Sequence, residues 1–294
     1  MVKNDKKFQT VDHIVMLVLC LLVLFPLALI VRSSLTSESE ILQHGYSLFP
    51  RVIDTTAYKY IFSEGSIFHA YLITILSTLA GTVMSVVITT MIAYTLAVPG
   101  LPGKGILSFY VMFTMLFSGG LVPSYIMWSN IFHIKNTFAA LLFPSLLCST
   151  FQVMVARSYF QNNIPQAILE SARIDGMSEF GIFFQIVLPL SKPIIATIGF
   201  MKALMYWNDW TNSLYYITDK NLVSIQALLN NMLSNIQYLA QSMDPSQIGA
   251  DVANLPSLGI RMAIAVVGVL PMLILYPFFQ KYYLQGLTVG AVKG

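Results

Sequence analysis

The dominant pattern along the chain is a series of long apolar stretches separated by shorter polar segments. A helix that crosses a bilayer needs roughly 20 mostly apolar residues. Because backbone groups in lipid must be bonded within their own segment, we expect these stretches to be helices. The predicted spans are residues 14–31, 72–97, 107–127, 138–156, 194–217 and 262–279. The pattern therefore predicts an all-α, polytopic membrane protein with six transmembrane helices.

The composition excludes several other classes of protein. The chain is 56% hydrophobic and only 10% charged, whereas an average soluble domain is about 25% charged. A soluble globular enzyme and a disordered chain are therefore both excluded. The net charge is +3 and no basic run occurs, so nucleic acid is not expected as a partner. Cys20 and Cys148 lie within apolar stretches and have neither a disulfide nor a metal-ligand spacing.

The first apolar stretch allows two interpretations. Lys3, Lys6 and Lys7 precede it, as basic residues precede the apolar run of a secretory signal peptide. No small-x-small cleavage site follows, however, since residues 29–32 read Leu-Ile-Val-Arg. This ending favours a retained membrane helix over a cleaved signal.

Lysine and arginine positions predict the orientation of the spans. With the N-terminus inside, nine of the 16 basic residues lie in inside segments, six lie outside and Lys202 lies within a span. Inside loops carry the excess of basic residues in membrane proteins, so we expect both termini to be cytoplasmic. The predicted organisation is a cytoplasmic N-terminus (1–13), a transmembrane domain (14–283) with an inner loop (160–193) and an outer loop (218–258), and a cytoplasmic tail (284–294).

The inner loop reads as two short helices joined by a turn. Asn163 can cap the first helix, and Pro165 suits its first turn. Asp175-Gly176 ends it, because glycine adopts the left-handed backbone that closes helices. A second helix is expected from Ser178 until Pro189 stops it. Such a helix–turn–helix offers a surface that a soluble partner could bind. The alternative is a helix lying on the membrane surface. A basic polar face would favour this alternative, but the basic face of this segment is weak.

Four segments of the chain carry a family resemblance. The spacing Glu170-Ser171-Ala172, Gly176 and Ile186-x-Leu188-Pro189 resembles the EAA loop of permease subunits in ABC importers that work with an extracellular binding protein. Ser171 stands where alanine is usual. Residues 117–125, 206–210 and 286–294 look like the third helix, fifth helix and tail of the carbohydrate-importing branch. Together the matches narrow the resemblance to permeases for oligosaccharides.

The resemblance implies a type I ABC importer permease fold whose inner loop docks into a cleft on a cytoplasmic ATPase. Glu170 would pair with a basic ATPase residue, and Gly176 would permit the turn between the helices; the alternatives are a solvated charge and an ordinary helix cap. The implied coupling residues are Glu170, Ser171, Ala172, Asp175, Gly176, Leu188 and Pro189. The tail residues Lys293 and Gly294 would contact the ATPase, unless the end of the chain is frayed.

The same resemblance implies a set of partners. A second permease, expected to be a different chain, would complete the pathway, and an extracellular solute-binding protein would deliver an oligosaccharide. Two ATPase subunits would drive alternating access. The chain holds no phosphate-cradling G-x-x-x-x-G-K-S/T motif. We therefore expect ATP and Mg to be bound by the ATPase, and this lipid-embedded chain to be a transport subunit without a cofactor rather than an enzyme.

The fifth span carries a polar stripe. Ionisable groups within spans usually face a bundle interior or a water-filled path, and helical spacing places Lys202, Tyr206, Asp209 and Ser213 on one face. Aromatic faces, amides and carboxylates suit sugars. The predicted substrate pathway comprises Lys202, Tyr206, Trp207, Asn208, Asp209, Trp210 and Asn212. An aromatic belt at the membrane interface is the alternative for the tryptophans, and a structural bridge to another helix is the alternative for Lys202.

Some features remain open on sequence alone. Helix irregularity is expected at four positions, Gly119, Gly120, Pro123 and Pro144. Small residues there would allow close packing between helices. The alternative is that broken helices line a cavity. The amphipathic stretch 222–239 of the outer loop would meet the binding protein or lie on the membrane. A secondary transporter is the competing function, and it would normally need an ion or proton site at mid-membrane, often with inverted repeats. Lys202 and Asp209 could form such a site, but no matching charges occur in a second half of the chain. An intramembrane enzyme is disfavoured because the spans hold no paired carboxylates.

Overall fold

The computed structural model describes residues 6–49, 52–63, 65–144, 147–242 and 257–291. Within these residues every regular element is helical, and the only strand-like pairing is an isolated bridge between Thr36 and Ile53. The expected all-α fold is therefore confirmed. The chain divides into two compact units, Met1–Ile67 with Leu229–Pro271 and Phe68–Leu228 with Met272–Gly294.

Three helices are long and apolar enough to cross a membrane without a break. They are α1 (Lys6–Ser33), α4 (Ser66–Ala97) and α16 (Ser257–Ala291). They contain the predicted first, second and sixth spans. The described part of the chain has up to five candidate spans if each of two bent helix pairs counts as one span. Helix α16 also continues through the described part of the predicted tail, as far as Ala291.

The third predicted span is interrupted. Helix α5 (Lys104–Leu116) ends before the glycines, and α6 (Leu121–Ile126) continues into a π-helical segment, η1 (Met127–Ile131). The two parts are bent by 114°. Gly120 has φ 85°, a left-handed backbone that glycine adopts without steric cost. The break falls at Gly119 and Gly120, where the sequence marks helix irregularity, so of the two interpretations left open there the structure has a broken helix.

The fourth and fifth predicted spans are interrupted as well. The fourth is divided between α7 (Ala139–Leu142) and α8 (Thr150–Asn163), and Pro144 follows the end of α7. In the fifth, α12 (Lys192–Trp207) ends and α13 (Thr211–Tyr216) begins after a short non-helical link. Each of these two predicted spans consists of two shorter helices rather than one continuous helix.

The segment between α1 and α4 contains two short helices, α2 (Glu38–His44) and α3 (Thr56–Ser63). The Glu38 carboxylate accepts a hydrogen bond from the backbone N–H of Leu258, 3.1 Å away. Because a helix N-terminus carries partial positive charge and unbonded N–H groups, this carboxylate stabilises the first turn of α16. The predicted outer loop begins with the 3-10 turn η3 (Lys220–Leu222) and helix α14 (Ile225–Ser242).

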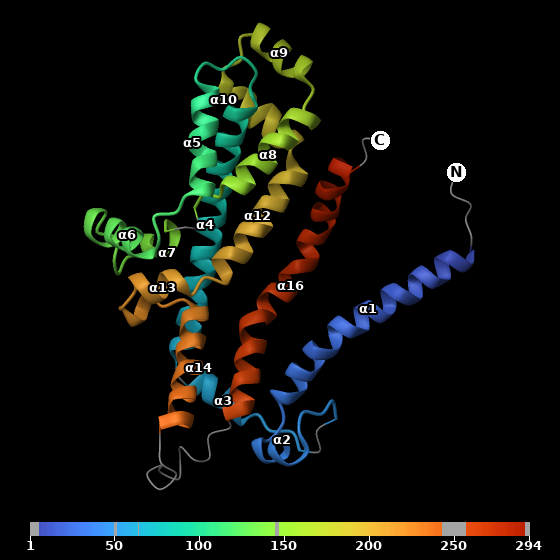
Figure 1. Ribbon diagram of the computed structural model, residues 1–294, viewed down its shortest axis with the longest axis vertical. Helices are drawn as coiled ribbons and strands as arrows, with labels where there is room; N and C mark the ends of the chain where they lie inside the picture. The colour runs from blue at the N-terminus through green and yellow to red at the C-terminus, as the bar shows by residue number, and fades with distance from the viewer. Residues whose placement is uncertain (1–5, 50–51, 64, 145–146, 243–256, 292–294) are drawn as a thin grey trace. The chain divides into compact units, whose positions relative to one another are not determined.

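The core of the second unit gathers at one end of α4. Helix α9 (Gln166–Ile174) lies at the same end as the turn between α4 and α5 (Figure 1). Buried side chains from six helical segments meet there, namely Ala93, Tyr94, Leu96 and Ala97 of α4; Val153, Ala156 and Phe160 of α8; Leu169 and Ala172 of α9; Ile182 of α10 (Glu179–Ile182); Phe183 and Val187 of the π-helical segment η2 (Phe183–Val187); and Ile194 and Ile198 of α12. This cluster fixes the predicted inner loop against the spans.

Candidate functional site

Helix α9 has a buried face and an exposed face. Leu169 and Ala172 belong to the core cluster at the end of α4, whereas Glu170 and Ser171 are exposed. The Ser171 hydroxyl donates to the carbonyl of Ala167 at 2.7 Å, so it bonds within its own helix. Of the first three predicted coupling residues, the glutamate and the serine are therefore available to a partner, and the alanine packs inward.

The turn after α9 has the expected glycine geometry. Gly176 has φ 79°, and no atom lies within 4 Å of the position that a Cβ would take. Its N–H donates to the carbonyl of Arg173 at 3.1 Å, and the N–H of Met177 donates to Ala172 at 2.9 Å. These bonds satisfy carbonyls at the end of α9. Asp175 is exposed in the same turn.

The start of α9 differs from the expectation. Asn163 is the last residue of α8, and its amide donates to the carbonyl of Tyr159 at 3.1 Å. Pro165 occupies the cap position of α9 with an extended backbone. Asn163 is therefore not the cap of α9, because α8 extends far enough to include it.

The second helix of the loop is composite. Ser178 caps α10 (Glu179–Ile182), and its hydroxyl accepts a hydrogen bond from the N–H of Gly181 at 3.2 Å. A π-helical segment, η2 (Phe183–Val187), leads into α11 (Leu188–Leu190). The predicted stop at Pro189 was wrong by one residue: the helix includes the proline and ends at Leu190. Leu188 is half-buried against the core cluster and Pro189 is exposed.

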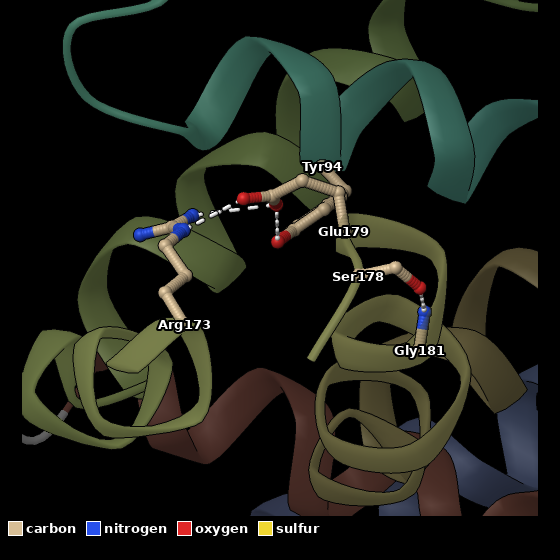
Figure 2. Close-up of polar contacts among 5 residues, drawn as sticks. All are labelled: Tyr94, Arg173, Ser178, Glu179 and Gly181. Carbon is tan, nitrogen blue, oxygen red and sulfur yellow. Dashed lines mark hydrogen bonds and ion pairs between the residues drawn. The ribbon is translucent and has the colours of Figure 1, made fainter. Parts of the chain in front are cut away.

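Arg173 and Glu179 form an ion pair within this loop, and Glu179 is also hydrogen-bonded to Tyr94 of α4, as Figure 2 shows. Arg173 Nε lies 2.6 Å from Glu179 Oε1, and the hydroxyl of Tyr94 donates to Glu179 Oε2 at 2.6 Å. The hydrogen bond to Glu179 raises the pKa of the Arg173 guanidinium above its ordinary value. Sequence reasoning missed this set, because Tyr94 is 85 residues from Glu179 and reads as an ordinary apolar-span residue.

The predicted pathway residues do not form one helical face. Helix α12 ends at Trp207 and α13 begins at Thr211, so the regular spacing that would align Lys202 with Asp209 and Ser213 is lost. Asp209 explains the restart: its carboxylate accepts the backbone N–H groups of Thr211 and Asn212, both at 3.2 Å. It acts at the beginning of α13 as a capping side chain does.

Burial separates the seven pathway residues into two groups. Asn208 and Trp210 are exposed at the break between α12 and α13, and Asp209 is half-buried. The others are buried: Lys202, Tyr206, Trp207 and Asn212. The structure therefore brings Asn208 and Trp210 to a surface, leaves Asp209 partly exposed between them and places the other four side chains inside the fold.

The buried members have structural contacts. The Tyr206 hydroxyl donates to the carbonyl of Leu142 at 2.9 Å, and the Asn212 amide donates to the carbonyl of Pro144 at 3.0 Å. These two bonds satisfy carbonyls at the interruption of the fourth span, where a regular helix cannot do so. Lys202 has an exposed fraction of 0%.

The described residues offer no metal site, since no group of three His, Cys, Asp or Glu side chains comes together among them. The two tail residues assigned to ATPase contact, Lys293 and Gly294, lie outside the described residues.

Comparison with known proteins places this geometry in a family. Residues 70–289 match the model described as the binding-protein-dependent transport system inner membrane component. The chain is 34% identical to the polygalacturonan/rhamnogalacturonan transport system permease protein YtcP of Bacillus subtilis, covering 99% of this chain and 100% of that protein. It is 31% identical to the arabinooligosaccharides transport system permease protein AraQ of Bacillus subtilis, covering 95% of this chain and 93% of that protein.

A solved structure is similar over nearly the whole chain. It is a crystal structure of a bacterial ABC transporter involved in the import of the acidic polysaccharide alginate, with a TM-score of 0.79 and 26% sequence identity over 96% of this chain and 99% of that chain. These matches confirm the expected resemblance to the carbohydrate branch of ABC permeases. The chain belongs to the binding-protein-dependent transport system inner membrane components, and it is a multi-pass transport subunit of a bacterial inner membrane rather than an enzyme.

Proposed function

We propose that this chain forms half of the transmembrane pathway of an ATP-driven oligosaccharide importer. A second permease chain completes the pathway, an extracellular solute-binding protein delivers the sugar, and two cytoplasmic ATPase subunits drive alternating access. ATP and Mg are bound by the ATPase, since no phosphate-cradling motif occurs in this chain. Both termini and the α9–α10 loop face the cytoplasm in this arrangement.

The exposed end of α9 carries the proposal. Ile174, a large apolar side chain, has an exposed fraction of 86% beside the turn at Gly176, and Glu170 and Asp175 are exposed near it. An exposed apolar side chain flanked by acidic groups suits a protein cleft with a basic rim. A helix resting on an anionic membrane surface would instead need a basic face. The basic residue of α9, Arg173, is engaged by Glu179.

The nature of the substrate follows from the relatives and from the break in the fifth span. Similar permeases serve polygalacturonan, rhamnogalacturonan and arabinooligosaccharides, so an oligosaccharide is the proposed cargo. Asn208 and Trp210 are exposed at the break between α12 and α13. An amide that bonds hydroxyls and an indole face that packs on C–H groups suit a sugar ring. These two residues are the proposed points of contact along the pathway.

Co-purification followed by reconstitution tests this function. The tagged chain is extracted gently from its native membrane, and the proteins that accompany it are identified. The complex is then placed in vesicles with ATP inside or outside, and uptake is measured for oligogalacturonides, arabinooligosaccharides and a neutral control sugar. We expect an ATPase and a second permease to accompany the chain, and uptake to require ATP and the binding protein. Recovery of the chain alone, with uptake that needs no ATP, would overturn the proposal in favour of a secondary carrier.

A further inference from the structure

Glu179 connects two helices that are distant in sequence. One carboxylate oxygen is bonded by Arg173, the last basic residue of α9, at 2.6 Å. The other oxygen accepts the hydroxyl of Tyr94, near the end of α4, also at 2.6 Å (Figure 2). Arg173 Nη2 makes a further, longer contact with this second oxygen at 3.3 Å. We call this set, Tyr94, Arg173 and Glu179, the loop bridge.

The loop bridge is better suited to fixing geometry than to stabilising the fold. The Arg173 and Glu179 side chains are 30% and 53% exposed, and partly exposed ion pairs contribute little to the free energy of unfolding. Short hydrogen bonds to a charged group are nevertheless directional. Tyr94 is buried, and its ring packs against Phe183 with centroids 5.5 Å apart. The Tyr94 hydroxyl is therefore held in a defined place.

Packing beside the loop bridge is incomplete. A cavity of about 180 Å³ lies against it, lined by Met91, Tyr94, Thr95, Glu179, Phe180 and Phe183. A void offers no van der Waals contact through which one helix can displace another. Beside this cavity, the hydrogen bonds of Glu179 are the polar link between α4 and the loop, next to the apolar contacts of the core cluster such as that of Tyr94 with Phe183.

We infer that Glu179 is a positioning residue that transmits movement of the α9–α10 loop to α4 through Tyr94. This role rests on the proposed function, because the movement is supplied by an ATPase docked on α9. When the ATPase shifts the end of α9, Arg173 carries Glu179 with it, and Glu179 moves the end of α4 through the hydroxyl of Tyr94. Loss of the hydroxyl leaves docking and ATP hydrolysis intact but weakens the response of the span.

Removal of single polar atoms tests the loop bridge in the complete transporter. Tyr94→Phe deletes only the hydroxyl, and Glu179→Gln removes the charge while keeping the size of the side chain. Tyr159→Phe is the matched control, because Tyr159 is a half-buried tyrosine packed against the same core cluster on α8. Sugar uptake and ATP hydrolysis are measured in the same vesicles, so that the sugar transported per ATP hydrolysed is obtained for each variant.

We expect Tyr94→Phe and Glu179→Gln to lower the sugar transported per ATP at least about fivefold, which is the lower range of coupling between distant sites. ATP hydrolysis and recovery of the complex should remain near those of the wild type, and Tyr159→Phe should behave as the wild type. Arg173→Lys, which keeps the positive charge, should retain more coupling than Arg173→Gln. A general structural role would instead reduce recovery of the complex, uptake and hydrolysis together.

The two levels of the proposal fail in different ways. If the wild-type complex takes up sugar without ATP, the proposed function is wrong. If the wild type couples uptake to ATP and both Tyr94→Phe and Glu179→Gln transport the same amount of sugar per ATP, the role of Glu179 is wrong while the importer function stands. Loss of complex in both variants would also overturn the positioning role, since it would make the loop bridge a requirement for folding.

Discussion

The ring of Tyr206 in α12 lies directly against Gly81 in α4, so closely that a Cβ at Gly81 would overlap the ring carbons. The Tyr206 hydroxyl is held by the carbonyl of Leu142 at 2.9 Å. The hydroxyl end of the Tyr206 ring is thus fixed, and the ring carbons lie against the backbone of Gly81. Through Tyr206, helices α4, α7 and α12 are joined within one unit. These contacts account for the burial of Tyr206, which the sequence analysis assigned to the sugar pathway.

Gly81→Ala is expected to destabilise the protein because the anchored ring cannot retreat. Overpacking a well-packed interior costs about 1–3 kcal/mol. Thermal unfolding in detergent should show a lower Tm for this variant. Gly199→Ala in α12 is the matched control, since its Cβ would lie 3.7 Å from Val86 at ordinary contact distance. An unchanged Tm for Gly81→Ala would contradict the close approach of Tyr206.

Gly176→Val is expected to uncouple transport from ATP hydrolysis. The position has φ 79°, and a β-branched residue held in the left-handed region costs about 1–2 kcal/mol, so the turn between α9 and α10 should change shape. Membrane insertion should be normal, because the turn is outside the predicted spans. Gly103→Val provides the control: it has φ 76° and equally open surroundings, so it imposes similar strain in the α4–α5 turn, which contains none of the predicted coupling residues. Wild-type uptake by Gly176→Val would argue against a coupling role.

Local backbone features of the site were predictable from the sequence. The turn at Gly176 follows from the freedom of glycine at positive φ. The apolar ridge expected from the helical spacing of Ile168, Leu169 and Ala172 is only partly buried: Leu169 and Ala172 pack inward, whereas Ile168 is 43% exposed. The apolar lengths of α1, α4 and α16 gave their spans. In each case the signal is contained within a few neighbouring residues or one helix.

Long-range contacts were not predictable in the same way. The hydroxyl of Tyr94 meets Glu179 only through the folded arrangement of α4 and α10, and neither residue interrupts its local pattern. The break after Trp207 was missed because no glycine or proline lies between α12 and α13. There a carboxylate, Asp209, starts the new helix by bonding two backbone N–H groups. Sequence reasoning treated this side chain as a sugar ligand because an acidic residue in a span usually marks function.

Glu170→Lys is expected to weaken retention of the ATPase. The side chain is exposed on α9. Reversal of its charge would bring like charges together where α9 docks in the basic cleft of the ATPase. We therefore expect the amount of ATPase recovered with the chain to fall roughly tenfold. Glu170→Gln should give an intermediate loss. Gln161→Lys, at an exposed position of α8, adds a positive charge outside the proposed docking surface and should retain the ATPase. Equal recovery in all variants would remove Glu170 from the interface.

Trp210 and Trp207 are expected to respond differently to substitution by alanine, because one is exposed and the other is buried. Trp210 has an exposed fraction of 42% at the break between α12 and α13, and Trp207 has 3%. Trp210→Ala should leave Tm unchanged and raise the sugar concentration for half-maximal uptake roughly fivefold, as expected for loss of one aromatic contact. Trp207→Ala should lower stability by about 3–5 kcal/mol through the cavity it leaves. Uptake and thermal unfolding, measured together, distinguish a pathway residue from a core residue. Normal uptake by Trp210→Ala would exclude this surface from the sugar path. A stable Trp207→Ala variant with impaired uptake would place the sugar path on the buried side of the break.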